Sequence, residues 1–259
     1  RLTVLADKVA EKYPRIKVGT LSYWYTRKPP KTIQPRPNVQ IQLCSIECCL
    51  IHAINDPGCP RNVEFCRDMT DWGRISSNVS IWNYNTNFTN YLLPCPNLRV
   101  IEPNVRFFVA NQAKGVFMQA AGNAVTAELS DLRNYIISSL IWDPTRSGEK
   151  LMDEFLSLHY GKAAPLIRRY VDLIHDTAEA SKLHRNCFAG RGEDYGLTEE
   201  TAKESLSLFE EALALAGSPE IARRVGKASI GAYLLAIEPV WVREPSAVPA
   251  EIRDKMKPL

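Results

Sequence analysis

Short apolar segments alternate with helical segments over the first 145 residues, and this alternation restricts the possible folds more than any other feature. β-branched and aromatic residues, bounded by turn residues, predict strands at 16–25, 39–47, 79–84 and 115–119. Apolar residues at helical spacing predict helices at 2–13, 61–75, 98–112 and 127–141. Because short strands that are separated by helices usually pair in parallel, the pattern predicts an α/β fold with a parallel sheet.

The second part of the chain is predicted to be helical. Apolar spacing and N-cap residues such as Thr198 and Ser218 predict helices at 147–159, 163–182, 198–216 and 218–237. We therefore expect three regions: a partial (β/α) barrel at 1–145, a helical extension at 146–240 and a tail at 241–259.

Four parallel strands are too few to close a barrel. A TIM-type (β/α)8 barrel needs eight, and an open parallel sheet leaves unpaired edges. The sequence also starts within a predicted helix, at Arg1. We expect the C-terminal half of a (β/α)8 TIM-type barrel, with the upstream half of the same barrel supplied earlier in a longer parent chain.

The charge pattern excludes several classes of partner. The net charge is +3, from 32 basic and 29 acidic residues without a basic block, which argues against nucleic-acid binding. No apolar run approaches the roughly 18 residues of a membrane span. No glycine-rich loop opens a helix to bind phosphate, and no metalloprotease motif is present. We expect no organic cofactor.

Seven cysteines leave two alternatives open. Their spacings, C-x3-C-C and C-x6-C, lack the paired C-x-x-C ligands that are typical of zinc sites, so no metal site is predicted. The cysteines are either buried thiols or include one disulfide. The disulfide would join Cys59 or Cys66 to Cys48, Cys49 or Cys95.

Functional side chains of (β/α) barrels lie at the C-terminal ends of the strands. The residues at these positions are mostly aromatic, amide or charged: Tyr23, Tyr25, Arg27, Glu47, His52, Trp82, Asn83, Tyr84, Asn87, Tyr91, Gln119 and Asn123. Aromatic rings stack on the flat faces of sugars, and amides and carboxylates bind sugar hydroxyls. The set predicts a carbohydrate site with Glu47 as its catalytic carboxylate and the other residues binding substrate.

Each of these residues also has a structural explanation. Trp82 and Tyr84 are equally consistent with packing in a barrel core. Glu47 is also consistent with an ion pair to an arginine, and His52 with a structural histidine.

Several strings resemble the bacterial family catalogued as domain of unknown function 4838. They are Thr26–Pro30, Leu43–Cys48, Asn87–Pro94, Pro103–Phe108 and Gly115–Phe117, within a resemblance that covers about residues 1–175. The resemblance implies a barrel shared with α-glucuronidases and β-hexosaminidase-like glycoside hydrolases. It also implies carbohydrate processing and a secreted or periplasmic location.

Two positions depart from the pattern of that family. Its third strand has the pattern I-W-D-Y, where this chain has Asn83, and its fourth has G-V-F-E-Q-G, where this chain has Met118. Glycoside hydrolysis needs two carboxyl groups about 5–9.5 Å apart. Among the predicted strand ends only Glu47 supplies one.

We therefore expect the full-length parent to hydrolyse O-glycosidic bonds of a polysaccharide or oligosaccharide, with its second acid on a strand outside this chain. This segment alone is expected to be inactive. Two alternatives stay open. One is a non-catalytic carbohydrate-binding domain with a degenerate site. The other is a scaffold whose hairpin at 197–239 docks a partner through Leu206, Phe209, Leu213 and Leu215.

Overall fold

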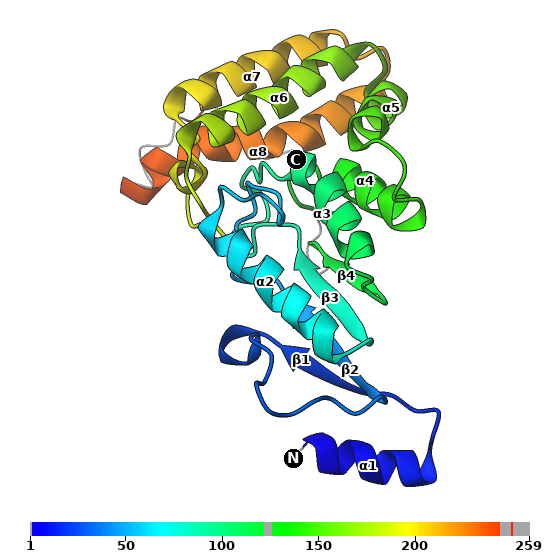
Figure 1. Ribbon diagram of the computed structural model, residues 1–259. Helices are drawn as coiled ribbons and strands as arrows, with labels where there is room; N and C mark the ends of the chain where they lie inside the picture. The colour runs from blue at the N-terminus through cyan, green and yellow to red at the C-terminus, as the bar shows by residue number, and fades with distance from the viewer. Residues whose placement is uncertain (1, 122–125, 244–249, 251–259) are drawn as a thin grey trace.

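The computed structural model describes residues 2–121, 126–243 and 250. The chain has a mixed α/β fold in which a parallel sheet lies between an N-terminal helix and a layer of four helices (Figure 1). The predicted α/β class and parallel sheet are therefore confirmed.

The sheet has four strands in the order β1-β2-β3-β4, and every neighbouring pair is parallel. The strands are β1 (Val18–Ser22), β2 (Val39–Cys44), β3 (Val79–Tyr84) and β4 (Val116–Gln119). All four predicted strands are present, but the first two end earlier than predicted. A 3-10 helix, η1 (Trp24–Thr26), follows β1, so Tyr25 is not in a strand. β2 ends at Cys44 because the chain turns there, with the Cys48 amide donating to the Ser45 carbonyl at 2.9 Å.

The predicted helices are also present. They are α1 (Leu2–Lys12), α2 (Pro60–Ile75), α3 (Leu98–Ala110) and α4 (Ser130–Trp142), then α5 (Gly148–Tyr160), α6 (Ala164–Ser181), α7 (Glu199–Ala214) and α8 (Pro219–Arg243). Two further 3-10 helices are η2 (Gly161–Ala163) and η3 (Gly192–Tyr195). α8 continues into the predicted tail as far as Arg243, whereas 244–249 and 251–259 lie outside the described residues. Within the described part of the chain, no helix combines the length and hydrophobicity needed to cross a bilayer.

The two faces of the sheet differ in polarity. One face carries Val39, Ile41, Leu43, Val79 and Ile81, which pack in a core with α2 and α3. Side chains alternate along a strand, so the intervening residues lie on the opposite face. These are polar or aromatic and include Gln40, Gln42, Ser80, Trp82 and Phe117. Phe117 is 48% exposed, although it lies in a strand.

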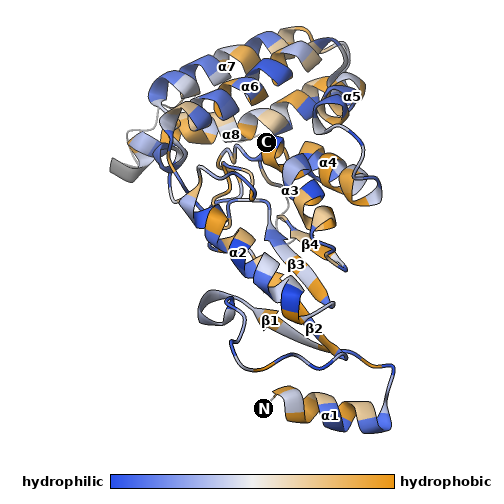
Figure 2. Cartoon of the chain, viewed as in Figure 1, coloured by the Kyte–Doolittle hydropathy of each residue, from blue (hydrophilic) through white to orange (hydrophobic). Residues whose placement is uncertain are grey.

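A second core joins the C-terminal edge of the sheet to the helical layer. It includes Cys44 and Tyr84 from strand ends together with side chains of α3 to α8, so it continues across the predicted boundary at residue 145. The helices of this layer carry both hydrophobic and hydrophilic residues along their length (Figure 2). Phe209 of the predicted hairpin is covered within the chain, with its ring 4.7 Å from that of Tyr170. Leu213 and Leu215 are 39% and 49% exposed.

A buried ion pair joins the loop before α3, the start of α4 and helix α6. The guanidinium of Arg133 donates to Glu128 Oε2 at 3.1 Å, to the Cys95 carbonyl at 3.1 Å and to Asn97 Oδ1 at 3.1 Å. Tyr170 of α6 donates its hydroxyl to Glu128 Oε1 at 3.3 Å. Burial raises the pKa of Glu128, while the charge of Arg133 opposes that effect. Because a buried charge is costly unless it is paired and hydrogen-bonded, the network fixes one arrangement of these loops.

His175 makes a second buried connection, between α6 and α3. Its Nε2 accepts from the Leu98 amide at 2.9 Å, and its Nδ1 lies 2.7 Å from the Val171 carbonyl. This arrangement requires the neutral ring with its proton on Nδ1. Burial is the main cause that lowers the pKa of His175 to about 3.

This histidine predicts a specific loss of stability in acid. In the unfolded chain this histidine has a pKa of about 6.5, so it binds a proton at pH values at which the folded chain keeps the ring neutral. The contribution of His175 to stability is therefore fully present above about pH 6.5 and is lost as the pH falls towards about 3. We expect a loss of about 2 kcal/mol between pH 7 and pH 5 from this group.

Urea unfolding at both pH values measures the effect. His175→Gln should be less stable at pH 7 but should lose less on acidification. His159→Gln is the matched control, because His159 is only half-buried and should change the pH dependence less. An unchanged pH dependence in the His175 variant would contradict this assignment.

Candidate functional site

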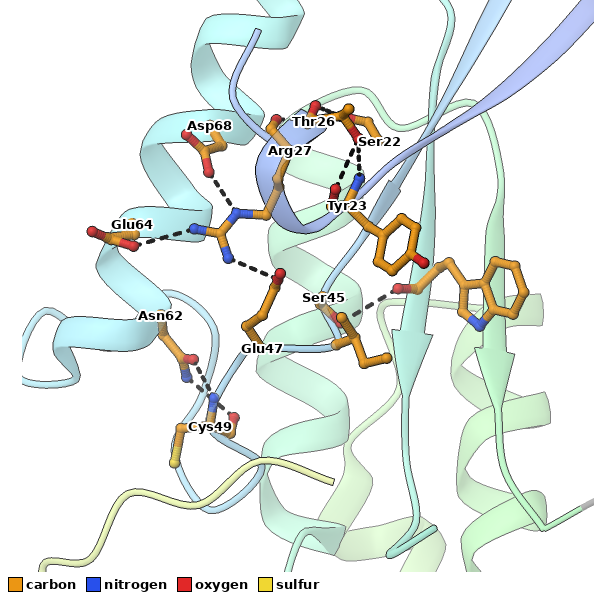
Figure 3. Close-up of polar contacts among 12 residues, drawn as sticks. Ser22, Tyr23, Thr26, Arg27, Ser45, Glu47, Cys49, Asn62, Glu64 and Asp68 are labelled. Atoms are coloured by element: carbon orange, nitrogen blue, oxygen red, sulfur yellow. Dashed lines mark hydrogen bonds and ion pairs between the residues drawn. The ribbon is translucent and has the colours of Figure 1, made fainter. Parts of the chain in front are cut away.

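Arg27 is the centre of a charged cluster at the C-terminal edge of the sheet. It follows η1, and its guanidinium contacts three carboxylates: Asp68 at 2.6 Å, Glu47 at 3.0 Å and Glu64 at 3.3 Å. Figure 3 shows this side chain directed at all three. The Arg27 side chain is only 8% exposed, and its carbonyl accepts from the indole of Trp72 at 2.7 Å.

The charge of Arg27 is maintained by its partners. Burial lowers the pKa of Arg27, but the hydrogen bond and the charge of Asp68 outweigh this effect, so the pKa is raised. Asp68 is 8% exposed and Glu64 is 60% exposed. Asp68 is therefore the partner that compensates the buried guanidinium, and Glu64 contributes from the solvent side.

Glu47 is a partly exposed member of the cluster and lies in the loop after β2. Its side chain is 33% exposed, and Oε2 binds Arg27. The arginine ion pair that the sequence left as an alternative is thus present. It also fixes the carboxylate in one orientation just beyond β2.

Trp82 and Gln119 form a polar-aromatic pair on neighbouring strands. Trp82 donates its indole N–H to Gln119 Oε1 at 2.6 Å. The ring of Trp82 lies parallel to that of Tyr84, with centroids 5.9 Å apart and an angle of 7°, and Phe117 lies 5.1 Å away. Trp82 and Gln119 are half-buried, whereas Tyr84 is buried. Burial is the main cause that raises the pKa of Tyr84.

Asn83 points away from these rings because it alternates with Trp82 and Tyr84 along β3. It is 3% exposed and donates through Nδ2 to Ser45 Oγ at 2.9 Å. Its Oδ1 is buried without a hydrogen-bond partner among the described residues. Such groups are rare in native proteins, because leaving a buried acceptor unpaired costs about 1–3 kcal/mol.

The other predicted residues lie outside the Arg27 cluster or hydrogen-bond to the backbone. Tyr23 and Tyr25 are 42% and 95% exposed beside η1. Asn87 is fully buried and donates to the Ala189 carbonyl at 2.9 Å. Tyr91 is half-buried, with its ring 5.9 Å from that of Phe88. Asn123 lies outside the described residues.

His52 lies in a different cluster, with Cys49, Cys59 and His184. All seven cysteines are free thiols and six are buried, so none of the disulfides left open by the sequence is present. The cysteines are not all simple core residues, however, because two of them face imidazole rings.

Strand ends alone did not identify Glu64 and Asp68, because both lie in α2. A signal was nevertheless available. The two acidic residues are four positions apart in a predicted helix, so they lie on the same face of it, next to its buried side.

Cavities lie at both edge strands of the sheet. One, of about 410 Å³, is lined at β1 by Thr20 and Leu21 and by part of the 28–36 connection. Another, also of about 410 Å³, lies at β4 beside Phe117, Met118 and Gln119. The polar-aromatic pair is therefore next to an open space at the edge of the sheet.

The cluster predicts unequal roles for its two helix carboxylates. Asp68→Asn removes the buried charge that compensates Arg27 and should lower the free energy of unfolding by about 1–3 kcal/mol. Glu64→Gln alters an exposed ion pair and should cost less than about 1 kcal/mol. Urea unfolding of both variants beside the wild type tests this order, and equal losses would show that Asp68 has no special role.

A comparison with known protein families supports the family resemblance that the sequence strings indicated. The family model described as Domain of unknown function (DUF4838) matches residues 2–172. Searches of curated proteins and of solved structures found no match. The match covers more than half of the sequence, and the chain belongs to the DUF4838 family.

Proposed function

We propose that this chain is part of a (β/α) barrel that hydrolyses O-glycosidic bonds, with Glu47 as one of its two catalytic carboxyl groups. One observation carries the proposal. Glu47 is a partly exposed carboxylate, oriented by a buried arginine, at the C-terminal edge of a parallel sheet. In (β/α) barrels this edge carries the active site.

The order of the strands supports the barrel. A doubly wound sheet reverses its strand order at a switch point, whereas here the strands follow one another as β1-β2-β3-β4. Helices α2 and α3 contribute to the core of one face, and the other face carries glutamines, a serine and exposed Phe117. We propose that further strands pair with β1 and β4 and enclose this second face as the barrel interior.

The chemistry of Glu47 follows from its partner. Because Oε2 of Glu47 already accepts a hydrogen bond from Arg27, we assign Glu47 the role of base or nucleophile rather than that of proton donor. The second carboxyl group would be the acid, and the proposal assigns it to a strand outside this sheet. Glu128 does not suit that role, because its side chain is 1% exposed and paired with Arg133.

Trp82 and Gln119 supply the sugar-binding groups in this proposal. A half-buried indole offers a flat surface for the C–H face of a pyranose ring, and the amide beside it offers hydrogen bonds to hydroxyls. The exposed rings of Tyr23 and Tyr25 would extend this surface on the β1 side.

The test compares Glu47→Gln with Glu64→Gln in the full-length protein. Both residues bind Arg27, so the second variant controls for loss of the ion pair. Across a panel of aryl glycosides, uronides and polysaccharides, Glu47→Gln should lower kcat by about 10²–10⁴-fold. Glu64→Gln should stay within about twofold, as expected of an exposed ion-pair partner. Equal turnover in all three proteins would remove Glu47 from catalysis.

A second candidate function is carbohydrate binding without hydrolysis. Asn83 and Met118 favour it, because neither side chain can take the part of a catalytic acid. Its signature would be sugar affinity that Trp82→Ala abolishes, in a full-length protein that turns over no member of the panel.

A further inference from the structure

We propose that Cys49, His52, Cys59 and His184 form a structural zinc site. Each residue offers one ligand atom, and these atoms all lie within 4.8 Å of one another. Its four residues have no role in the proposed carbohydrate chemistry, so a test of metal binding does not depend on glycoside hydrolysis.

The distances suit tetrahedral coordination. Cys49 Sγ lies 3.2 Å from His52 Nδ1, and Cys59 Sγ lies 3.2 Å from His184 Nδ1. Zinc bonds of about 2.3 Å to sulfur and 2.0–2.1 Å to nitrogen place tetrahedral ligand atoms about 3.3–3.8 Å apart. The imidazole rings of His52 and His184 lie side by side, with centroids 4.5 Å apart. Small side-chain adjustments would therefore complete the site.

The backbone around the ligands is held by a buried asparagine. Asn62 of α2 accepts from the Cys49 amide at 2.8 Å and donates to the carbonyls of His52 and Ala53, both at 3.0 Å. Its side chain is fully buried. Such contacts pre-form the 49–59 loop, which lowers the entropy lost when a metal binds.

A metal ion would displace the thiol protons of both cysteines. Burial is the main cause that raises the pKa of Cys59 to about 11. The position of Cys59 just before α2 opposes that effect, because a helix N-terminus stabilises negative charge. The two cysteines are 3% and 0% exposed, whereas both histidines are half-buried, so a metal can enter from the histidine side.

The donor set identifies the metal and its role. Two thiolates and two imidazoles in a tetrahedral arrangement are typical of zinc. All four positions are filled by protein, which indicates a structural rather than a catalytic ion. The ion would join the loop after β2 to the segment after α6, where the Leu50 amide already donates to the Arg185 carbonyl at 2.8 Å.

A bound ion would also affect the C-terminal edge of the sheet. Glu47 lies two residues before Cys49, so the ion would anchor the loop that carries this carboxylate. Zinc would thus connect the helical layer to the edge of the sheet at which Glu47 lies.

The first experiment measures metal content. The chain is produced with zinc in the medium and purified in reducing buffer, and zinc is measured by inductively coupled plasma mass spectrometry. We expect about one zinc per chain in the wild type and in Cys66→Ser, a nearby cysteine outside the cluster. Cys59→Ser and His184→Asn should each retain less than about one tenth of that amount. Zinc that is absent from the wild type, or equally retained in these variants, overturns the proposal.

The second experiment starts with the wild-type chain and follows the metal by spectroscopy. Cobalt(II) added to the metal-free wild type should give the visible absorption and thiolate charge-transfer bands of a tetrahedral thiolate site, and zinc should displace them. A chelator should lower Tm in the wild type and in Cys66→Ser but not in Cys59→Ser. An octahedral cobalt spectrum, or a Cys49–Cys59 disulfide in the reduced preparation, would contradict the site.

Discussion

Parallel strand pairing is the constraint on which the rest of the structure depends. Each parallel pair needs a crossover connection, and the crossovers here place α2 and α3 against one face of the sheet. Parallel pairing also brings the C-terminal ends of β1 to β4 to one edge. Arg27 and Glu47 follow the ends of β1 and β2, and Gln119 is the last residue of β4, so their position at one edge is a direct result of strand direction.

Loops at that edge are irregular, and buried polar groups hold them in place. Arg27 joins the loop after β1 to α2, Arg133 joins the loop before α3 to the start of α4, and His175 joins α6 to α3. Each group is expensive to bury, and each has partners that compensate for that cost. Hydrophobic packing alone would tolerate several loop arrangements, whereas these directional contacts permit one.

The charged cluster and the Cys-His cluster are neighbours along the chain, and the same helix supports both. Asp68 and Glu64 of α2 orient Arg27, and Asn62 of the same helix holds the backbone of Cys49 and His52. A shift of α2 would therefore disturb both clusters at once. Such coupling means that the proposed metal ion would also steady the position of Glu47.

The sequence by itself determined the local elements and the family. Runs of β-branched and aromatic residues placed all four strands, helical spacing placed the helices, and the strings around Glu47 and Asn87 indicated the DUF4838 family. These features depend on residues within a few positions of one another, and local periodicity records them directly.

Only the tertiary structure decided which side chains meet. Arg27 and Asp68 are 41 positions apart, Trp82 and Gln119 are 37 apart, and Cys59 and His184 are 125 apart. Strand order, helix placement and loop turns set these contacts, and none of them leaves a periodic trace in the sequence. For that reason the sequence named Glu47 and Arg27 as site residues but not Asp68 and Glu64, which complete the cluster. It also predicted no metal site, because the fourth residue of the proposed one, His184, lies beyond α6.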